Sequence, residues 1–371
     1  MPKNIVVCFD GTANEFGKNL TNVVKLYDAL VKDPVRQVVY YHPGIGTMEA
    51  AGALTTWTRW ATRVAGMAFG YGLESDIRDA YVFLMNSYEP GDDVYLFGFS
   101  RGAYTVRAVA ALLHGYGVIR PGNEPLVPYA IRMLSAIHCI RRDSPTREKD
   151  VHDIFRLEAD FKATFSRTDC KLKFVGVWDT VSSVGWIKNP LILPYTANNP
   201  DIEIGRHALA IDERRAFFRT NRWMPGKPGE PSGPKDVKQV WFPGVHSDIG
   251  GGYPEKDSGL AKIALEWMLK EAVAAGLLVD PAKRDRVLGK AGAGYAAPDP
   301  KAEMHESLKG AWRLAEIVPK QHYDSATGKR SWRVNLARRR TIPEHALIHE
   351  SAYQRGPEYQ SRLPANATRV S

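Results

Sequence analysis

The segment with the clearest chemical meaning is Gly98-Phe99-Ser100-Arg101-Gly102, which matches the pattern G-x-S-x-G. An apolar run, Asp93–Gly98, leads into it, and a segment rich in Ala, Val and Leu, Gly102–His114, follows it. Between a strand and a helix this pattern makes a sharp turn that exposes the serine hydroxyl, and its glycines avoid clashes of Cβ atoms. We therefore predict that Ser100 is a nucleophile, although serine also caps helices in such places.

A nucleophilic serine needs a general base, and the base needs an acid that orients it. In a parallel sheet both are expected just beyond the carboxyl ends of strands. Asp179 directly follows the apolar run Lys171–Trp178, and His246 follows Lys238–Phe242 after a short turn. The chain order serine, aspartate, histidine is that of the α/β-hydrolase architecture, so we predict a triad of Ser100, Asp179 and His246.

Other histidines and another aspartate compete for these roles. His42 and His207 each stand near the end of an element, and each is an alternative base. Asp248 lies two residues after His246 and is an alternative acid, although an Asx turn beside a glycine loop explains it better. We prefer His246 and Asp179 because they complete the expected chain order.

Cofactors are not expected. Asp10, Asp179 and Asp248 would bind a divalent cation if they met at one edge of the sheet. Because these carboxylates lack regular ligand spacing, we predict no metal site, and the expected chemistry needs no organic cofactor.

Charge that develops on the substrate oxygen in this chemistry requires hydrogen-bond donors. The turn Asp10-Gly11-Thr12, after the first apolar run, occupies the place whose loop donates one N–H group in this architecture. Arg101 would supply a second N–H from the start of the following helix, where the helix dipole favours negative charge. We predict an oxyanion hole formed by Gly11, Thr12 and Arg101.

Strands and helices alternate along the chain, which indicates a parallel sheet with right-handed crossovers. Short continuous apolar runs are typical of strands buried on both faces. The predicted strands are Asn4–Phe9, Gln37–Tyr41, Asp93–Gly98, Lys171–Trp178 and Lys238–Phe242, and the predicted helices are Thr21–Lys32, Leu73–Ser87, Gly102–His114 and Gly259–Ala274.

The chain has 371 residues, which fits one large α/β domain with insertions, or two domains. We expect a core over residues 1–280, with insertions at about 48–71, 127–168 and 181–200. Residues 281–371 are expected to form a C-terminal extension that packs on the core or trails it. The predicted fold is α/β and α/β-hydrolase-like, with a mostly parallel sheet flanked by helices and with lid-like insertions.

The composition, with 44% hydrophobic and 25% charged residues, excludes whole-chain disorder, collagen and coiled coil. Three cysteines without metal-ligand spacing suit a reducing compartment. The sequence shows no signal-peptide pattern and no run of about 18 apolar residues that would span a membrane. We therefore expect a cytoplasmic protein.

Two apolar segments, Trp186–Tyr195 and the insertion at 48–71, would cover an acyl-chain site as lids, or would equally serve as core. Aromatic and basic side chains in such segments are typical of contact with a membrane interface. The candidate substrate-binding residues on them are Trp186, Ile187, Leu191, Leu193, Trp57 and Trp60. The basic run Lys320–Arg340 would attract anionic phospholipid, whereas no motif for nucleic acid accompanies it.

Six blocks of the sequence resemble the DUF2235 family in the expected order. They are FDGTANEFGKNLTNV, YYHPGIGT, DVYLFGFSRGAYTVRAVAALL, FVGVWDTVSSVG, RHALAIDERRAFF and VWFPGVHSDIGGGYPE, and they cover most of residues 1–270. This α/β-hydrolase family includes the Tle1 group of type VI secretion lipase effectors. The larger effectors carry an additional membrane-docking module, whereas only about 100 residues follow the core here.

The resemblance implies a triad at Ser100, Asp179 and His246 and hydrolysis of the phospholipase A type. It also implies an acyl ester or phospholipid substrate, peripheral membrane contact, and an immunity or secretion-spike partner. Export by a type VI system without a signal peptide would follow. We therefore expect a serine hydrolase of carboxylic esters, with two alternatives: an esterase for short-chain non-lipid esters, or a hydrolase-fold interaction module with little or no turnover.

Overall fold

The structure is a computed structural model of the chain. It describes residues 2–11, 19–44, 67–143, 147–167, 170–181, 185–186, 189–190, 193–216, 218–224, 233–292, 294–310, 312–313, 316–317, 320–323 and 330–371.

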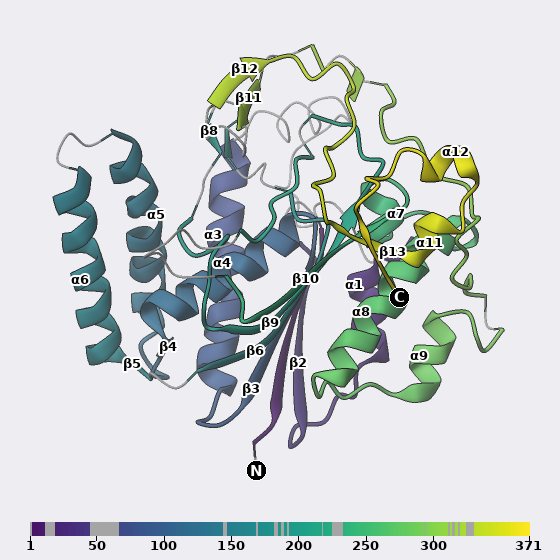
Figure 1. Cartoon of the computed structure of the whole chain (residues 1–371). Coiled ribbons are helices and arrows are strands. Elements are labelled where there is room, and N and C mark those ends of the chain that lie inside the picture. The colour runs from purple at the N-terminus through teal and green to yellow at the C-terminus, as the bar shows by residue number, and fades with distance from the viewer. Residues whose placement is uncertain are drawn as a thin grey trace, which may run out of the picture.

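Within these residues, eight strands form one sheet in the order β14-β13-β10-β9-β6-β3-β1-β2, and every neighbouring pair is parallel (Figure 1). The strands are β1 (Asn4–Phe9), β2 (Gln37–His42), β3 (Asp93–Phe99), β6 (Lys171–Trp178), β9 (Ile202–Ala210), β10 (Asp236–Phe242), β13 (Leu347–His349) and β14 (Thr368–Val370). The central strands β1 and β3 are buried along nearly their whole length, as parallel strands covered on both faces are. The predicted α/β fold with a mostly parallel sheet is confirmed.

Helices cover both faces of this sheet (Figure 1). One face carries α3 (Met67–Ser87) and α4 (Arg101–Tyr116), and the other carries α1 (Asn22–Ala29), α8 (Gly259–Ala274) and α9 (Pro281–Val287). Alternate residues of β1 point to opposite faces: Val7 joins the cluster under α3 and α4, whereas Val6 and Cys8 join the cluster under α1 and α8. The core therefore consists of two apolar layers, one on each side of the sheet.

Smaller elements connect and extend this framework. The expected insertion at 127–168 is a hairpin of two helices that packs against α4 and is seen at the left of Figure 1. The remaining elements are β4 (Val118–Ile119), η1 (Glu124–Leu126), α5 (Val127–Asp143), α6 (Arg147–Phe165), β5 (Ser166–Arg167), β7 (Gly185–Trp186), β8 (Asn189–Pro190), α7 (His246–Gly250), η2 (Glu255–Asp257), β11 (Lys320–Tyr323), β12 (Arg330–Arg333), α11 (Glu350–Tyr353) and α12 (Pro357–Gln360). No helix in the described ranges combines the length and the hydropathy that a bilayer crossing requires.

Three strands of the sheet were not predicted from the sequence. Strand β9 contains Arg206 and His207, which interrupt its apolar run, but the buried Arg206 is paired with Glu271 and Asp236. Strands β13 and β14 are only three residues long, too short for a period-2 pattern to be recognised. Both lie in the segment expected as a C-terminal extension, so this segment contributes two strands to the central sheet.

The junction between β3 and α4 packs very closely against the end of β1. A Cβ atom on Gly102 would overlap the carbonyl oxygens of Phe9 and Asp10, and one on Gly98 would lie 2.5 Å from the carbonyl oxygen of Gly102. These neighbours are backbone atoms, which cannot move aside without moving β1 or α4. Glycine is therefore required at both positions of the turn that carries Ser100.

We expect the substitution Gly102→Ala to lower the free energy of unfolding by about 2–3 kcal/mol, because an added methyl group forces the backbone of β1 and α4 apart. Urea denaturation monitored by circular dichroism measures this change. Gly356→Ala is the matched control, since a Cβ atom at Gly356 meets no atom within 4 Å. Equal unfolding midpoints for the two variants would contradict the close packing described here.

Candidate active site

Ser100 occupies the turn between β3 and α4 in an unusual backbone conformation, with φ 58° and ψ −118°. Positive φ is rare for residues other than glycine, and such strain concentrates at functional sites. The Ser100 N–H group donates a hydrogen bond of 3.0 Å to the carbonyl oxygen of Trp178 at the end of β6. The turn is thereby fixed to the neighbouring strand, and the hydroxyl is held at the carboxyl edge of the sheet.

His246 and Asp179 lie beside this hydroxyl. His246 Nε2 is 2.8 Å from Ser100 Oγ, and His246 Nδ1 is 2.5 Å from Asp179 Oδ2. Asp179 follows β6 directly, and His246 is the first residue of α7, which begins just after β10. All three side chains are buried. The structure therefore brings the three residues predicted as a triad into one continuous hydrogen-bonded chain.

The surroundings of His246 and Asp179 determine the charge of this pair. Burial lowers the pKa of the His246 imidazole below its ordinary value, and the hydrogen bond and charge of Asp179 raise it only in part. Burial alone would raise the pKa of the Asp179 carboxyl, but the charge of Arg340 and the hydrogen bond with His246 hold it well below its usual range. At neutral pH the pair is therefore a neutral imidazole on an ionised carboxylate, the state that a general base requires.

Two aromatic rings pack against the imidazole of His246. The ring centroids of Phe99 and Phe218 each lie 4.7 Å from that of His246, with interplanar angles of 32° and 73°. These contacts help to bury His246, which is 4% exposed. Phe99 also packs against Gly250, where a Cβ atom would overlap its ring, so the glycine loop after His246 lets the helix approach the nucleophile turn.

Glu213 and Arg215 support the histidine from the loop after β9. The His246 backbone N–H group donates to Glu213 Oε2 at 3.2 Å, and Arg215 makes two hydrogen bonds of 2.9 Å to the same carboxylate. Burial opposes ionisation of Glu213, but the hydrogen bonds and charge of Arg215 lower its pKa to about 2. Both residues belong to the block RHALAIDERRAFF, which the sequence analysis singled out without a role for them.

Arg340 also contacts this site, although from the sequence we expected it to have another role. We expected it in a basic run facing anionic lipid, but its side chain is 9% exposed and its guanidinium binds both oxygens of Asp179. Nη1 lies 2.5 Å from Oδ1, and Nη2 lies 3.0 Å from Oδ2. The buried carboxylate explains the difference, because it attracts a counter-charge from a segment 161 residues away.

The alternative acid Asp248 has a partner of its own. Its Oδ1 lies 2.7 Å from His305 Nδ1, and its Oδ2 accepts the Val245 N–H group at 3.0 Å. Asp248 thus caps the start of α7 and binds a histidine other than His246. These contacts place Asp248 beside the hydrogen-bonded chain of Ser100, His246 and Asp179 and outside it.

The two histidines considered as alternative bases have partners other than Ser100. His207 Nε2 accepts the backbone N–H group of Thr180 at 3.1 Å, and burial lowers the pKa of this histidine to about 3. His42 stacks on Phe9, and its Nδ1 accepts the Gly44 N–H group. Both histidines stabilise strand ends.

The structure describes two of the three residues that we predicted to form an oxyanion hole. The Gly11 N–H group donates to the Asp10 carboxylate at 2.7 Å, so in this conformation it is engaged within its own turn. Arg101 directly follows Ser100 as the first residue of α4 and is buried. Thr12 lies outside the described residues. The assignment of Gly11, Thr12 and Arg101 stays a prediction.

Of the substrate-binding residues predicted on the two apolar segments, the structure describes the side chain of Leu193. Leu193 is buried in the core cluster of α3 and α4, and its N–H group donates to the Tyr104 hydroxyl. The side chain of Trp186, and Ile187, Leu191, Trp57 and Trp60, lie outside the described residues. A lid function for these segments therefore stays a prediction.

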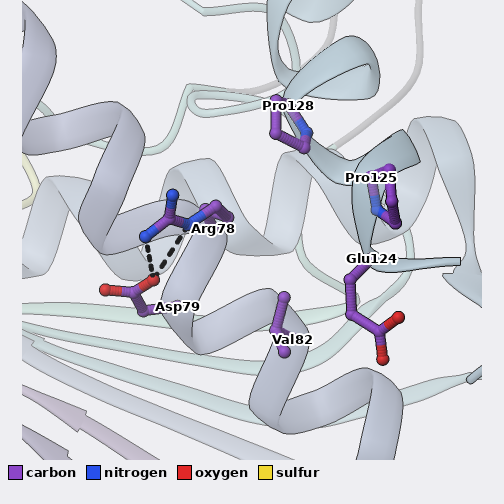
Figure 2. Close-up of a pocket in the computed structure, with 6 residues that line it drawn as sticks. All are labelled: Arg78, Asp79, Val82, Glu124, Pro125 and Pro128. Atoms are coloured by element: carbon purple, nitrogen blue, oxygen red, sulfur yellow. Dashed lines mark hydrogen bonds and ion pairs between the residues drawn. The ribbon is translucent and has the colours of Figure 1, made fainter. Parts of the chain in front are cut away.

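A separate cavity of about 490 Å³ lies between α3 and the start of α5 (Figure 2). Its lining residues are Arg78, Asp79, Val82, Glu124, Pro125 and Pro128. Arg78 and Asp79 are hydrogen-bonded to each other in this cavity. None of these residues belongs to the triad or the predicted oxyanion hole, so the cavity is distinct from the candidate active site.

The three aspartates considered as metal ligands are engaged separately. Asp10 accepts hydrogen bonds from the hydroxyls of Thr21 and Tyr41, while Asp179 and Asp248 have the partners given above. In the part of the chain that the structure describes, no group of three or more His, Cys, Asp or Glu side chains is arranged to hold a metal ion.

The fold and this geometry together define an α/β-hydrolase-like chain with a serine, histidine and aspartate in hydrogen-bond contact. Residues 3–271 match the model of the family described as the catalytic domain of Tle1-like phospholipase effectors of the type VI secretion system. The chain belongs to this family.

Other comparisons cover parts of longer proteins. An uncharacterized protein of Saccharomyces cerevisiae is 35% identical over 224 residues, which are 58% of this chain and 32% of that protein. The crystal structure of an uncharacterized protein from Pseudomonas aeruginosa is 20% identical, with a TM-score of 0.48 over 80% of this chain and 49% of that chain. The structure of the Tle1 effector bound to the VgrG spike is 18% identical, with a TM-score of 0.35 over 70% and 52%. The chain thus spans about a third of the yeast relative and about half of each solved structure.

We expect the His246 imidazole to take up a proton only below its ordinary pKa of about 6.5, because burial disfavours the charged ring. Chemical shifts of ¹³C-labelled histidine followed against pH measure this value, with His246→Gln to assign the signal. Asp179→Asn should lower the pKa further, since the carboxylate that favours the imidazolium is lost. A midpoint above 6.5 in the wild-type protein would contradict this account of the site.

Proposed function

We propose that this protein is a serine hydrolase that cleaves carboxylic esters, and that it acts as a phospholipase A-type lipid esterase. The proposal rests on one observation: the continuous hydrogen-bonded chain of Ser100, His246 and Asp179 at a strained turn on the carboxyl edge of the sheet. Membership in a family of phospholipase effector catalytic domains supports the choice of a lipid ester.

The geometry supports the following acylation step. His246 Nε2 takes the proton of the Ser100 hydroxyl as Oγ attacks the acyl carbonyl carbon. Asp179 Oδ2 accepts the hydrogen bond from Nδ1–H, which fixes the tautomer and stabilises the imidazolium. The carbonyl oxygen becomes an oxyanion next to the start of α4, where backbone N–H groups and the helix dipole favour negative charge.

Breakdown of this intermediate releases the alcohol. The imidazolium returns its proton to the leaving alkoxide oxygen, and the carbonyl re-forms as an ester of Ser100. A water molecule then loses a proton to His246 and attacks this acyl-enzyme. The carboxylic acid departs as Oγ recovers the proton, which regenerates the starting state.

The family context extends the proposal to partners. The Tle1 effector in one solved structure is bound to a VgrG spike. We propose by analogy that this protein is delivered by a type VI system, with a spike and an immunity protein as partners and peripheral contact with a membrane at its substrate. Binding of purified spike protein, followed by native mass spectrometry, tests this part separately from the chemistry.

Substitution of the triad should remove activity. Ser100→Ala and His246→Ala should each lower kcat by at least about a thousandfold, because triad members act as a unit. Asp179→Asn should be similarly severe through loss of the correct tautomer. Hydrolysis of p-nitrophenyl esters measures kcat, and covalent labelling with a fluorophosphonate probe reports the reactive serine.

Matched controls are available for two of these variants. Asp248→Asn and His305→Ala remove an aspartate and a histidine that bind each other beside the site, and each should retain most of the activity. If Asp248→Asn is far more harmful than Asp179→Asn, the triad acid is assigned wrongly. Near-normal turnover of His246→Ala, or an unlabelled wild-type protein, would reject the hydrolase and favour the interaction module.

The substrate class is tested with a series of acyl chains. We expect kcat/KM on p-nitrophenyl esters to increase from acetyl to longer chains, and phospholipid vesicles to release fatty acid, because burial of each additional methylene contributes about 0.8 kcal/mol. Mass spectrometry of the lipid products measures the release, with Ser100→Ala as the control. Highest activity on acetyl esters together with intact vesicles would favour the short-chain esterase.

A further inference from the structure

The guanidinium of Arg340 is fixed by several contacts around the acid of the triad. It forms a bidentate ion pair with Asp179, and its Nη1 also lies 3.3 Å from the carbonyl oxygen of Ala210. Nε donates to the carbonyl oxygen of Phe218 at 3.0 Å, and Nη2 donates to the same oxygen. The planar group therefore has a single orientation, in which it faces both carboxylate oxygens.

The two carboxylate oxygens of Asp179 have different sets of partners. Oδ1 accepts the Ala210 N–H group at 3.0 Å and Arg340 Nη1, while Oδ2 accepts Arg340 Nη2 and faces His246 Nδ1. Rotation of the carboxylate would break both contacts with the guanidinium. Arg340 thus holds the oxygen that orients the histidine in its working position.

A buried carboxylate also needs a counter-charge. Asp179 is completely buried, and an ion in that position is unstable unless it is paired and hydrogen-bonded. A neutral imidazole supplies a hydrogen bond and no charge, so the pair with His246 alone would leave one negative charge in the interior. Arg340 neutralises it.

Arg340 comes from outside the part of the chain that matches the family model. That match ends at residue 271, whereas Arg340 lies in the segment that leads into β13 of the central sheet. We propose that Arg340 is a positioning residue of the triad, so that the C-terminal segment completes an active site which residues 3–271 of this chain leave without this counter-charge. This inference rests on the proposed function.

Several other titratable groups lie on the elements packed around His246 and Asp179, and most have partners of their own. Arg215 and Glu213 form an ion pair, Asp248 binds His305, and Lys262 of α8 binds Glu255. His207 is buried behind Thr180. Asp10 accepts hydrogen bonds from the hydroxyls of Thr21 and Tyr41, and Asp212 accepts them from the Gly244 N–H group and the Tyr359 hydroxyl. Arg101 is buried at the start of α4. Unlike the groups named above, Arg340 is in direct contact with both carboxylate oxygens of Asp179.

The sign of the pH effect follows from charge alone. Without a proton, the pair of His246 and Asp179 carries one negative charge, and with a proton it is neutral. A positive neighbour disfavours uptake of that proton, whichever of the two groups receives it. Removal of Arg340 should therefore shift the acidic limb of the rate profile to higher pH, since the protonated pair cannot act as a base.

The experiment compares Arg340→Ala, Arg340→Lys and the matched control Arg339→Ala in the full chain. Arg339 is the preceding residue, has the same charge and is exposed. We expect Arg340→Ala to lower kcat by about a hundredfold, because a small misplacement of a catalytic group has this effect, with a smaller change in KM. Its acidic limb should move to higher pH. Arg339→Ala should match the wild type in both respects.

Two further measurements separate positioning from folding. Arg340→Lys retains the charge and loses the bidentate geometry, so its acidic limb should stay closer to that of the wild type while kcat falls. Arg340 also lines a cavity of about 260 Å³ with Asp212, Arg339 and Tyr359, which gives small solutes access to its position. Millimolar guanidinium should therefore restore part of the activity of Arg340→Ala and leave Arg339→Ala unchanged.

Three outcomes would overturn the inference. One is wild-type kcat and pH profile in Arg340→Ala. Another is a loss of kcat with an unmoved acidic limb and no rescue by guanidinium, which indicates a purely structural role. If Arg340→Ala does not fold, wild-type kcat in a folded Arg340→Lys would count against positioning by the bidentate pair. In each case a dead Ser100→Ala variant leaves the proposed function intact, whereas an active Ser100→Ala variant rejects that function itself.

Discussion

A completely buried carboxylate at the end of β6 is the constraint on which the rest of the site depends. Asp179 stays ionised there because Arg340 provides charge and because His246 and the Ala210 N–H group provide hydrogen bonds. The ionised acid fixes the tautomer of the imidazole, and the imidazole in turn faces the hydroxyl of Ser100. Each group of the site therefore has one orientation that its neighbours determine.

The parallel sheet explains how residues from distant parts of the chain meet in this arrangement. Strands β3, β6 and β10 end at the same edge; Ser100 and Asp179 directly follow β3 and β6, and His246 follows β10 after a three-residue turn. Glycines allow the tight approaches, at Gly102 against β1 and at Gly250 against Phe99. Strain is stored at Ser100, whose φ of 58° is maintained by a strand before it and a helix after it.

Local patterns in the sequence were sufficient to predict five of the eight strands of the described sheet, and the three residues that the structure joins in one hydrogen-bonded chain. Ser100 lies in a recognisable turn, Asp179 directly follows an apolar run, and His246 follows another after a short turn. Arg340 could not be found in this way, because it reaches Asp179 only after β13 has joined the sheet beside β10. The engagement of the Gly11 N–H group by Asp10 is likewise a tertiary detail that no spacing in the sequence reveals.

The central claim is that Ser100 becomes covalently acylated during turnover. The most direct test is to quench the enzyme with acid while it hydrolyses an ester, and to locate the bound acyl group by mass spectrometry of its peptides. The account predicts an acyl adduct on Ser100, which accumulates in the steady state and is absent from His246→Ala. Hydrolysis at a normal rate with no adduct on Ser100, or with the adduct on another residue, would contradict it.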